Sequence, residues 1–149
     1  MPPKVSVVIP VYNVGKQLEK CLDSVVAQTF PDIEIIVVND GSTDNSPEII
    51  ARYADKDSRI VVIDKSNEGL AYARKSGIEA AQGEYIQHLD GDDFLEPDAI
   101  ELLYNKAIEE KADMVVFPFW FDYVDEKKKR SSRPAPVVYD SISFFQSIA

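Results

Sequence analysis

Short apolar runs alternate with helical patterns along the first two-thirds of the chain. The runs are rich in Val and Ile and do not alternate strictly with polar residues, which is typical of strands buried on both faces of a parallel sheet. Between them, apolar residues recur at helical spacing, as Leu18, Leu22 and Val25 do. The pattern predicts strands at residues 5–11, 33–38, 59–64 and 85–89, and helices that follow the turn at 12–15, start near 46, and span about 70–82 and 97–111.

The last third of the chain has a weaker pattern. An apolar run at residues 114–121 predicts a fifth strand, with Pro118 marking a bulge or an edge because proline cannot donate a ladder hydrogen bond. Residues 125–136 are charged and contain Ser and Pro, so we expect a solvated loop there. Residues 141–149 predict one or two turns of helix.

The order of these elements predicts the fold class. Strands that alternate with helices indicate an α/β fold with a three-layer, doubly wound and mostly parallel sheet. A chain of 149 residues can bury one sizeable core, so we expect a single domain over residues 1–149. Ligands of such sheets bind beyond the carboxyl ends of the strands. One crevice should therefore collect the polar residues that directly follow predicted strands: Asn13, Asp40, Asn67, Asp90 and Asp92.

The fourth predicted strand runs into an acidic stretch, Asp90-Gly-Asp-Asp93. If the backbone stays extended, Asp90 and Asp92 point to the same side about 6 to 7 Å apart, and Gly91 allows the chain to bend them closer. Mg²⁺ and Mn²⁺ prefer carboxylate oxygens, and Mg²⁺ usually takes one or two of them together with substrate phosphates. The stretch predicts a metal bridge to a phosphorylated ligand, although by itself it also fits a solvated acidic turn before a helix.

The charge balance supports a role for a cation. The chain has 26 Asp and Glu against 16 Lys and Arg, a net charge of −10, which argues against non-specific binding to nucleic acid or to an anionic membrane. A phosphorylated ligand near the acidic stretch would meet like charge, at about 4 kcal/mol for a unit pair about 4 Å apart and an effective dielectric of about 20. A divalent cation, Mn²⁺ or Mg²⁺, would remove this conflict.

Signals for export and for membrane spans are missing from the sequence. The N-terminus lacks the apolar core of a signal peptide, and no apolar run approaches the roughly 18 residues of a membrane span. Cys21 is the single cysteine, so a disulfide framework and a cysteine-based zinc site are excluded. We therefore expect a cytoplasmic chain that has no membrane span and no nucleic-acid partner.

Several phosphate- and metal-binding motifs are excluded. No Gly-x-Gly-x-x-Gly and no Gly-x4-Gly-Lys-Ser/Thr loop occurs after a strand. An aspartyl-phosphate loop would need Asp where Val38 stands, and an EF-hand starting at Asp90 would need Gly where Leu95 stands. We expect His88 to be a buried, hydrogen-bonded imidazole rather than a ligand or base, whereas Tyr12 fits equally a stacking platform for a base and a cover for the sheet.

Four stretches of the chain resemble the family 2 glycosyltransferases, inverting enzymes of the GT-A fold that use sugar nucleotides. They occur in the order and at the spacing of that family, and the resemblance covers about residues 4–115. The resemblance implies a GT-A sheet, a nucleoside-diphosphate sugar (most of all a UDP sugar) as donor, and transfer of a hexosyl or N-acetylhexosaminyl group in cell-surface polysaccharide biosynthesis. The stretches are VSVVIPVYN (5–13), IVVNDGSTD (36–44), NEGLAYAR (67–74) and LDGDD (89–93).

The resemblance also implies how the nucleotide is bound. Val11, Tyr12 and Asn13 would lie along the nucleotide. Asp40 would accept a hydrogen bond from the base, which suits a carboxylate opposite a uracil-type ring N–H. Asn67 would shape its loop. Asp40 and Asn67 also fit plain turn and cap chemistry, because both residue types favour such positions.

For the diphosphate and the metal, the resemblance implies a second group of residues. Arg74 would reach from its helix toward the nucleotide or its phosphates, where a forked donor suits a pair of charged oxygens. Asp92 would bind the metal, while Asp90 would bind the metal, a metal-bound water or the ribose beside Gly91. Asp93 would sit at the start of the next helix.

The resemblance leaves the acceptor side open. An inverting transfer needs a base for the acceptor hydroxyl, and family members carry it well after the Asp-x-Asp stretch, so we assign no catalytic base in this chain, which ends at Ala149. We expect a donor-binding N-terminal part of a longer enzyme that acts on a carbohydrate or lipid-linked acceptor. The alternative is a non-catalytic module that binds nucleotide sugars. A nucleotidyltransferase is disfavoured because no Gly-rich, Arg-containing loop follows the first strand.

Overall fold

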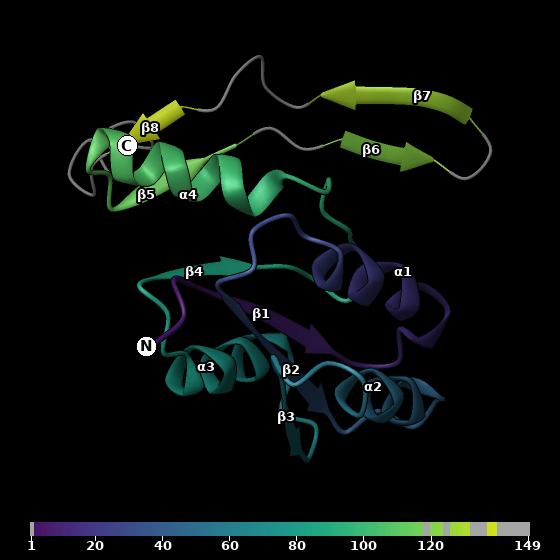
Figure 1. The fold of residues 1–149 in the computed structure, drawn as a ribbon. Coiled ribbons are helices and arrows are strands. Elements are labelled where there is room, and N and C mark those ends of the chain that lie inside the picture. Colours follow the sequence, from purple (N-terminus) through teal and green to yellow (C-terminus); the bar gives the residue numbers. More distant parts are fainter. Residues whose placement is uncertain (1, 118–119, 124–125, 132–136, 140–149) are drawn as a thin grey trace. The chain divides into compact units, whose positions relative to one another are not determined.

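The structure, a computed structural model, describes residues 2–117, 120–123, 126–131 and 137–139. The chain divides into two units, Met1–Glu101 and Leu102–Ala149, and each has its own sheets (Figure 1). The single domain that we expect from the length stays a prediction.

A four-stranded parallel sheet organises the first unit. Its strands run in the order β3-β2-β1-β4, with β1 paired to β2 on one side and to β4 on the other. β2 and β3 thus lie on one side of β1, and β4 lies on the other side. This is the order of a doubly wound sheet. The prediction of a parallel, doubly wound α/β sheet is confirmed. The strands are β1 (Val5–Val11), β2 (Ile33–Asp40), β3 (Ile60–Lys65) and β4 (Tyr85–His88).

The two middle strands lie at the centre of the core. Every residue of β1 is buried, and so is every residue of β2 except Glu34. Their Val and Ile side chains are β-branched and pack well on a pleated surface. Burying one such side chain stabilises the fold by about 1.5 to 3 kcal/mol relative to leaving it exposed. This burial explains why the sequence shows unbroken apolar runs here instead of an alternating pattern.

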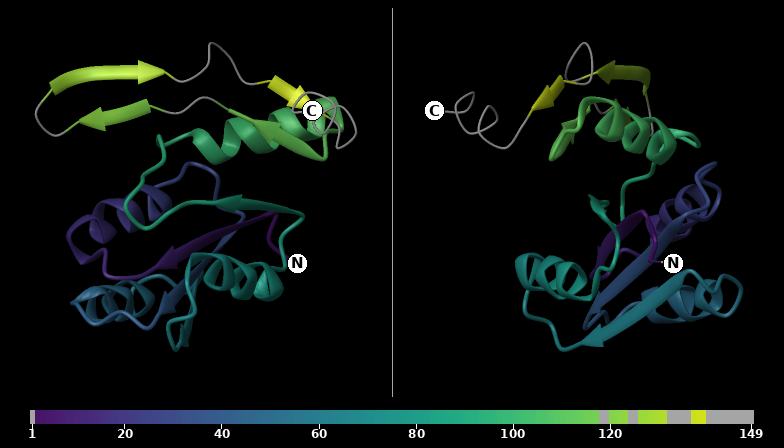
Figure 2. Two further views of the ribbon diagram at one scale, coloured as in Figure 1. Left: turned by 180° about the vertical axis from the view of Figure 1, so that it is seen from behind. Right: turned by 60° about the vertical axis from the view of Figure 1, so that its left-hand side comes forward.

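Helices cover both faces of this sheet. α1 (Gly15–Val26) and α2 (Ser46–Ala54) lie side by side over one face, and α3 (Leu70–Ala80) lies over the other (Figure 2). α3 packs on the sheet through small residues, Ala73 and Gly77. A Cβ atom on Gly77 would overlap the Val8 side chain and would lie 3.3 Å from Val38 Cγ2, so this helix needs a glycine to come so close to the sheet. The three-layer arrangement is thus confirmed in the first unit.

In the second unit the described strands form two antiparallel pairs. The chain enters this unit within α4 (Ala99–Glu110). β5 (Met114–Val116) then pairs with β8 (Val137–Tyr139), and β6 (Trp120–Tyr123) pairs with β7 (Glu126–Ser131). None of the described helices combines the length and the apolar character that crossing a bilayer requires.

Two expectations for this part of the chain are wrong. The run at 114–121 is not one strand, because β5 and β6 belong to different two-stranded sheets. The predicted loop at 125–136 contains β7, whose charged residues pair with β6. Charge and composition report local preference only, whereas a neighbouring strand supplies backbone hydrogen bonds that override it. Pro118 and the helix expected at 141–149 lie outside the described residues.

Element boundaries in the first unit also shift from the predicted ones. β2 continues through Asn39 to Asp40 because these residues pair with Asp64 and Lys65 of β3. α3 ends at Ala80 rather than near residue 82, since the backbone of Ala81 is extended. The longer β2 carries two polar residues, Asn39 and Asp40, to the end of a buried strand.

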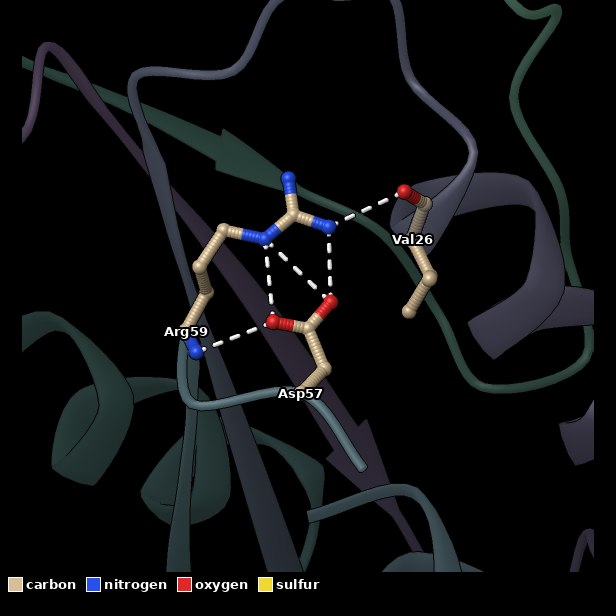
Figure 3. A network of polar contacts seen from close by, with 3 residues as sticks. All are labelled: Val26, Asp57 and Arg59. Atoms are coloured by element: carbon tan, nitrogen blue, oxygen red, sulfur yellow. Dashed lines mark hydrogen bonds and ion pairs between the residues drawn. The ribbon is translucent and has the colours of Figure 1, made fainter. Parts of the chain in front are cut away.

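Arg59, just before β3, forms an ion pair with Asp57 and a hydrogen bond to the end of α1 (Figure 3). The Arg59 guanidinium donates to both oxygens of Asp57, at 3.0 Å from Nε to Oδ1 and 2.6 Å from Nη2 to Oδ2. The same Nη2 donates to the carbonyl oxygen of Val26 at 3.0 Å. These hydrogen bonds lower the pKa of Asp57 from its ordinary value of 3.8.

We expect Asp57→Asn to lower the free energy of unfolding by about 1 kcal/mol at neutral pH, since one charged partner of a partly exposed pair is lost. Because the folded-state pKa of Asp57 is lowered, its contribution is complete above the unfolded-state pKa of about 3.9 and is lost as the pH falls through the folded value. Urea unfolding of both proteins between pH 2 and 7 measures the difference. The exposed Asp55→Asn is the control, and a difference that persists unchanged at the lowest pH would contradict this account.

We expect Gly77→Ala to destabilise the first unit by about 1 to 3 kcal/mol, although alanine favours helices, because the new methyl group must displace stiff, buried valine side chains. Chemical denaturation provides the measurement. Ser76→Ala in the same helix is the control, since its hydroxyl bonds only to the Tyr72 carbonyl of α3. A Gly77→Ala protein as stable as the parent would show that the helix can move away from the sheet at no cost.

Candidate nucleotide-sugar site

The loops that follow β1 and β2 are tied together by Asn13. Its backbone has a φ of 53°, in the left-handed region that Asn tolerates better than most residues. The side-chain Oδ1 accepts hydrogen bonds from the backbone N–H of Thr43 at 2.7 Å and of Asp44 at 3.3 Å. The backbone N–H of Asn13 in turn donates to Ser42 Oγ at 3.1 Å. The first two loops therefore form one connected unit.

The loops that follow β2 and β3 meet at Asp40. This residue is only 2% exposed. Its two carboxylate oxygens accept from the backbone N–H groups of Glu68 at 3.1 Å and Gly69 at 2.8 Å, and Lys65 Nζ lies 3.8 Å from Oδ1. Asp40 therefore holds the third loop in place through two backbone N–H groups of that loop.

A close backbone contact reinforces the same junction. Gly41 has a φ of 70°, and a Cβ atom there would lie 2.7 Å from the backbone nitrogen of Asn67. Glycine is needed on both counts, because a side chain would strain the backbone and would strike the third loop. Asn67 itself is exposed beside this contact.

The acidic stretch after β4 is bound by an arginine from α3. Arg74 Nη2 donates to both oxygens of Asp90, at 2.6 and 2.9 Å. The backbone is not extended here, because the Asp93 N–H donates to the Asp90 carbonyl oxygen at 2.9 Å and closes a turn. The spacing of about 6 to 7 Å that an extended backbone would give therefore does not apply here. β4 ends at His88, and the chain bends as Gly91 allows.

The turn after β4 also lies against the end of β1. A Cβ atom on Gly91 would be 3.2 Å from the Pro10 carbonyl oxygen, 3.0 Å from Val14 Cγ2 and 3.4 Å from Val11 Cγ2. Glycine at this position therefore also lets another chain segment approach closely, in addition to the bend that we expect of it. All four loops thus meet at the carboxyl edge of the sheet.

Some of the predicted site residues take part in the contacts between these loops, and the others lie beside them. The structure brings Asn13, Asp40, Asn67, Arg74, Asp90 and Gly91 into this connected set of loops. Val11 is buried at the end of β1, beside Gly91. Tyr12 is 51% exposed, and Asp92 is also exposed. The two exposed side chains are available to a ligand.

The negative charge of the acidic turn changes the pKa of its neighbours. Burial raises the pKa of Asp93, and the charges of Asp92 and Asp90 raise it further. Burial and the charges of Asp93, Asp92 and Asp90 raise the pKa of the Cys21 thiol to about 12. Cys21 is therefore a protonated, unreactive thiol, and the turn has a negative potential that one arginine does not cancel.

The residues of the turn fit a divalent cation that shares its coordination with a ligand. Among the described residues, no group of three or more His, Cys, Asp or Glu side chains is arranged to hold a metal ion. Asp92, however, is exposed, and no described residue forms a hydrogen bond or ion pair with its carboxylate. One or two carboxylates completed by water and phosphate oxygens is the usual set for Mg²⁺.

Sequence reasoning missed two residues that shape the site, and it misjudged a third. Asn39 donates to Asp64 Oδ1 at 2.8 Å, and Asp44 accepts from the Gly15 N–H at the start of α1 at 2.9 Å. The position of Asp44 two residues before α2 signals its bond from the Ser46 N–H at 3.0 Å, but gives no signal for its bond to α1. His88 is exposed and not buried as expected, because it stands on the exposed face of β4 together with Ile86.

Comparisons with known proteins give the family. Residues 6–147 match the family described as Glycosyl transferase family 2. The glycosyltransferase GlyA of Streptococcus pneumoniae is 39% identical to this chain. The match covers 97% of this chain but only 21% of GlyA. The chain belongs to glycosyltransferase family 2.

Solved structures give the fold type. The chain is similar to Staphylococcus aureus TarS in complex with UDP-GlcNAc, with a TM-score of 0.71, 30% identity, and coverage of 76% of this chain and 33% of that one. It is also similar to the mannosyltransferase PcManGT of Pyrobaculum calidifontis in complex with GDP-Man and Mn²⁺, with a TM-score of 0.64, 28% identity, and coverage of 79% and 35%. The fold is that of the GT-A glycosyltransferases, and the chain spans about a fifth to a third of the length of these relatives.

We expect Asp40→Asn to destabilise the loop at residues 67–69 and to cost about 1 to 3 kcal/mol of stability, because an amide can offer only one oxygen to the two backbone N–H groups and turns its own donors toward one of them. Urea unfolding and amide hydrogen exchange of Glu68 and Gly69 measure the effect. The exposed Asp32→Asn is the control. Unchanged protection of both amides would show that Asp40 does not hold this loop.

Proposed function

We propose that this chain binds a nucleoside-diphosphate sugar, most of all a UDP sugar, and contributes the donor half of an inverting, metal-assisted glycosyltransferase. The observation that carries the proposal is the connection of four loops at one sheet edge, through Asn13, Asp40, Gly91 and the Arg74–Asp90 pair. The UDP-GlcNAc bound to TarS supports the UDP type of donor. A hexosyl or N-acetylhexosaminyl group is the sugar that we expect to be transferred.

The nucleoside is assigned to the side of the site where β1 and β2 end. Tyr12 exposes half of its side chain and offers a flat surface to a base. Val11 and Asn13 flank Tyr12 in the chain. Asp40, at the end of β2, and Asn67, in the third loop, belong to the same connected set of loops. A buried carboxylate such as Asp40 can still accept one ring N–H, since each oxygen has two lone pairs and here uses one for a backbone N–H.

The diphosphate is assigned to the acidic turn, where Arg74, Asp90 and Asp92 bring both signs of charge together. Asp92 would hold Mn²⁺ or Mg²⁺, with Asp90 as a second ligand or as an acceptor for the ribose or for a metal-bound water. The metal, when bound, stabilises the negative charge that develops on the leaving diphosphate. Arg74 keeps Asp90 in place and adds a fixed positive charge next to the phosphates, and Gly91 keeps the turn against β1.

The acceptor side of the reaction lies beyond what these residues explain. No described residue is assigned as the base that activates the acceptor hydroxyl, and the family relatives are several times longer than this chain. A carbohydrate or lipid-linked acceptor, a role in cell-surface polysaccharide biosynthesis and a cytoplasmic location stay predictions. So does the possibility that this chain binds the donor and leaves catalysis to further residues.

Thermal unfolding with UDP, GDP and dTDP, each with and without Mn²⁺, tests the donor proposal. We expect UDP with Mn²⁺ to stabilise the protein most, by about 2.7 kcal/mol at 100 times its Kd. Asp92→Asn should remove the part of this effect that depends on Mn²⁺, whereas the exposed Asp98→Asn should keep it. Stabilisation by none of the nucleotides would contradict the proposal, and a metal effect that survives in Asp92→Asn would overturn the metal assignment.

Hydrolysis or transfer assays separate an enzyme from a binding module. We expect wild-type protein to release UDP slowly from a UDP sugar when Mn²⁺ is present. Donor binding without any release of UDP, with or without candidate acceptors, would favour the binding module.

A further inference from the structure

Side chains of α1 and of the residues just after it hold the backbone of the segment that carries the acidic turn. Cys21 and Ser24 lie one turn apart on the same side of α1, and Gln28 follows shortly after the helix ends at Val26. The Cys21 thiol lies 3.6 Å from the Asp90 carbonyl oxygen and can donate to it. Ser24 Oγ accepts from the Leu95 N–H at 3.1 Å and donates to the Cys21 carbonyl oxygen at 2.7 Å.

Gln28 makes the most complete set of these contacts. It is a polar residue that is only 7% exposed. Its Nε2 donates to the Glu96 carbonyl oxygen at 2.7 Å and to the Ser24 carbonyl oxygen at 3.0 Å, and its Oε1 accepts from the Ile100 N–H at 3.0 Å. The side-chain amide thus uses both of its donors and its oxygen, and it replaces the backbone partners that this irregular segment lacks.

These contacts fix the segment on both sides of Asp92 without using its charge. Asp90 is held before it, and Leu95, Glu96 and Ile100 are held after it. The side chains that make these hydrogen bonds are neutral, so none of the bonds cancels the negative potential of the turn. A charged group of α1, the Lys20 ammonium, lies 3.6 Å from the centroid of the Phe94 ring in the same segment. Just after α1, the Thr29 N–H extends the same arrangement by donating to the Pro97 carbonyl oxygen at 2.9 Å.

We infer that Gln28 is a positioning residue for donor binding, which sets the place of the Asp92 carboxylate by fixing the backbone of residues 95–100. The inference rests on the proposed function of the turn as a metal and diphosphate site. A carboxylate on a preordered segment binds a metal with less loss of conformational freedom, and residues that hold metal ligands in place typically change metal affinity by about 10- to 100-fold when they are replaced. A residue that only filled space would affect stability but not the coupling between metal and nucleotide.

The test compares Gln28→Met, which keeps the volume but removes the three hydrogen bonds, with the matched control Gln82→Met at an exposed position. Calorimetry gives the Kd of UDP with and without Mn²⁺ for each protein. We expect the factor by which Mn²⁺ tightens UDP binding to fall about tenfold in Gln28→Met and to stay unchanged in Gln82→Met. An unchanged factor in a folded Gln28→Met protein would overturn the inference.

A second pair of variants is used if Gln28→Met does not fold. Ser24→Ala removes the acceptor of the Leu95 N–H, and Ser76→Ala removes a serine that bonds only within its own helix. We expect the Mn²⁺ factor to fall about fivefold in Ser24→Ala, as for the loss of one hydrogen bond, and to be unchanged in Ser76→Ala. Equal factors in these two proteins would overturn the inference.

Amide hydrogen exchange separates a failure of this inference from a failure of the proposed function. If Gln28 and Ser24 position the segment, the Ile100 amide exchanges faster in Gln28→Met and the Leu95 amide faster in Ser24→Ala, while amides of α3 keep their rates. If wild-type protein binds no UDP, the proposed function fails and the exchange rates alone decide the positioning. Unchanged rates at both amides would overturn it even if UDP binds.

Discussion

The burial of β1 and β2 is the constraint on which the rest of this structure depends. Both strands are covered by helices on each face. Apart from Ser6 and Glu34, which bond to each other near the amino ends, their polar residues lie at the carboxyl end of β2 and in the loops that follow the strands. Because their neighbours run parallel to them, polar residues appear where several strands end together. The apolar core therefore determines where the chemistry of this protein can be placed.

The loops at that edge are held by hydrogen bonds from side chains to backbone. Asn13 and Asp40 each bind two backbone N–H groups of another loop, and Gln28 binds both a carbonyl group and an N–H group of the segment after β4. Loops lack the regular partners that helices and strands provide, so buried polar groups in them must be satisfied in this way. Gly41 and Gly91 add to this by letting backbones approach closely.

The acidic turn keeps a charge imbalance that the fold does not remove. Arg74 pairs with Asp90, while the Asp92 carboxylate stays exposed and the pKa of Asp93 is raised by burial and by its acidic neighbours. A site made only for stability would pair or neutralise these groups, because like charges held close together destabilise a fold. Such a turn is suited to a cation that joins it to an anionic ligand, and membership of glycosyltransferase family 2 agrees with this use.

The sequence by itself determined the order of strands and helices in the first unit, the parallel sheet and the loops that carry the polar residues, because unbroken apolar runs and helical spacing are local signals. It did not determine that Asp90 pairs with Arg74, that the acidic stretch turns, or that His88 is exposed. Nor did it show that Asp40 and Gln28 hold distant loops, or that residues 126–131 form a strand. Only the tertiary structure decided these features. The contacts of Arg74, Asp40 and Gln28 depend on partners many residues away, and local preference does not fix the turn that Asp93 closes on Asp90 or the pairing of residues 126–131 with β6.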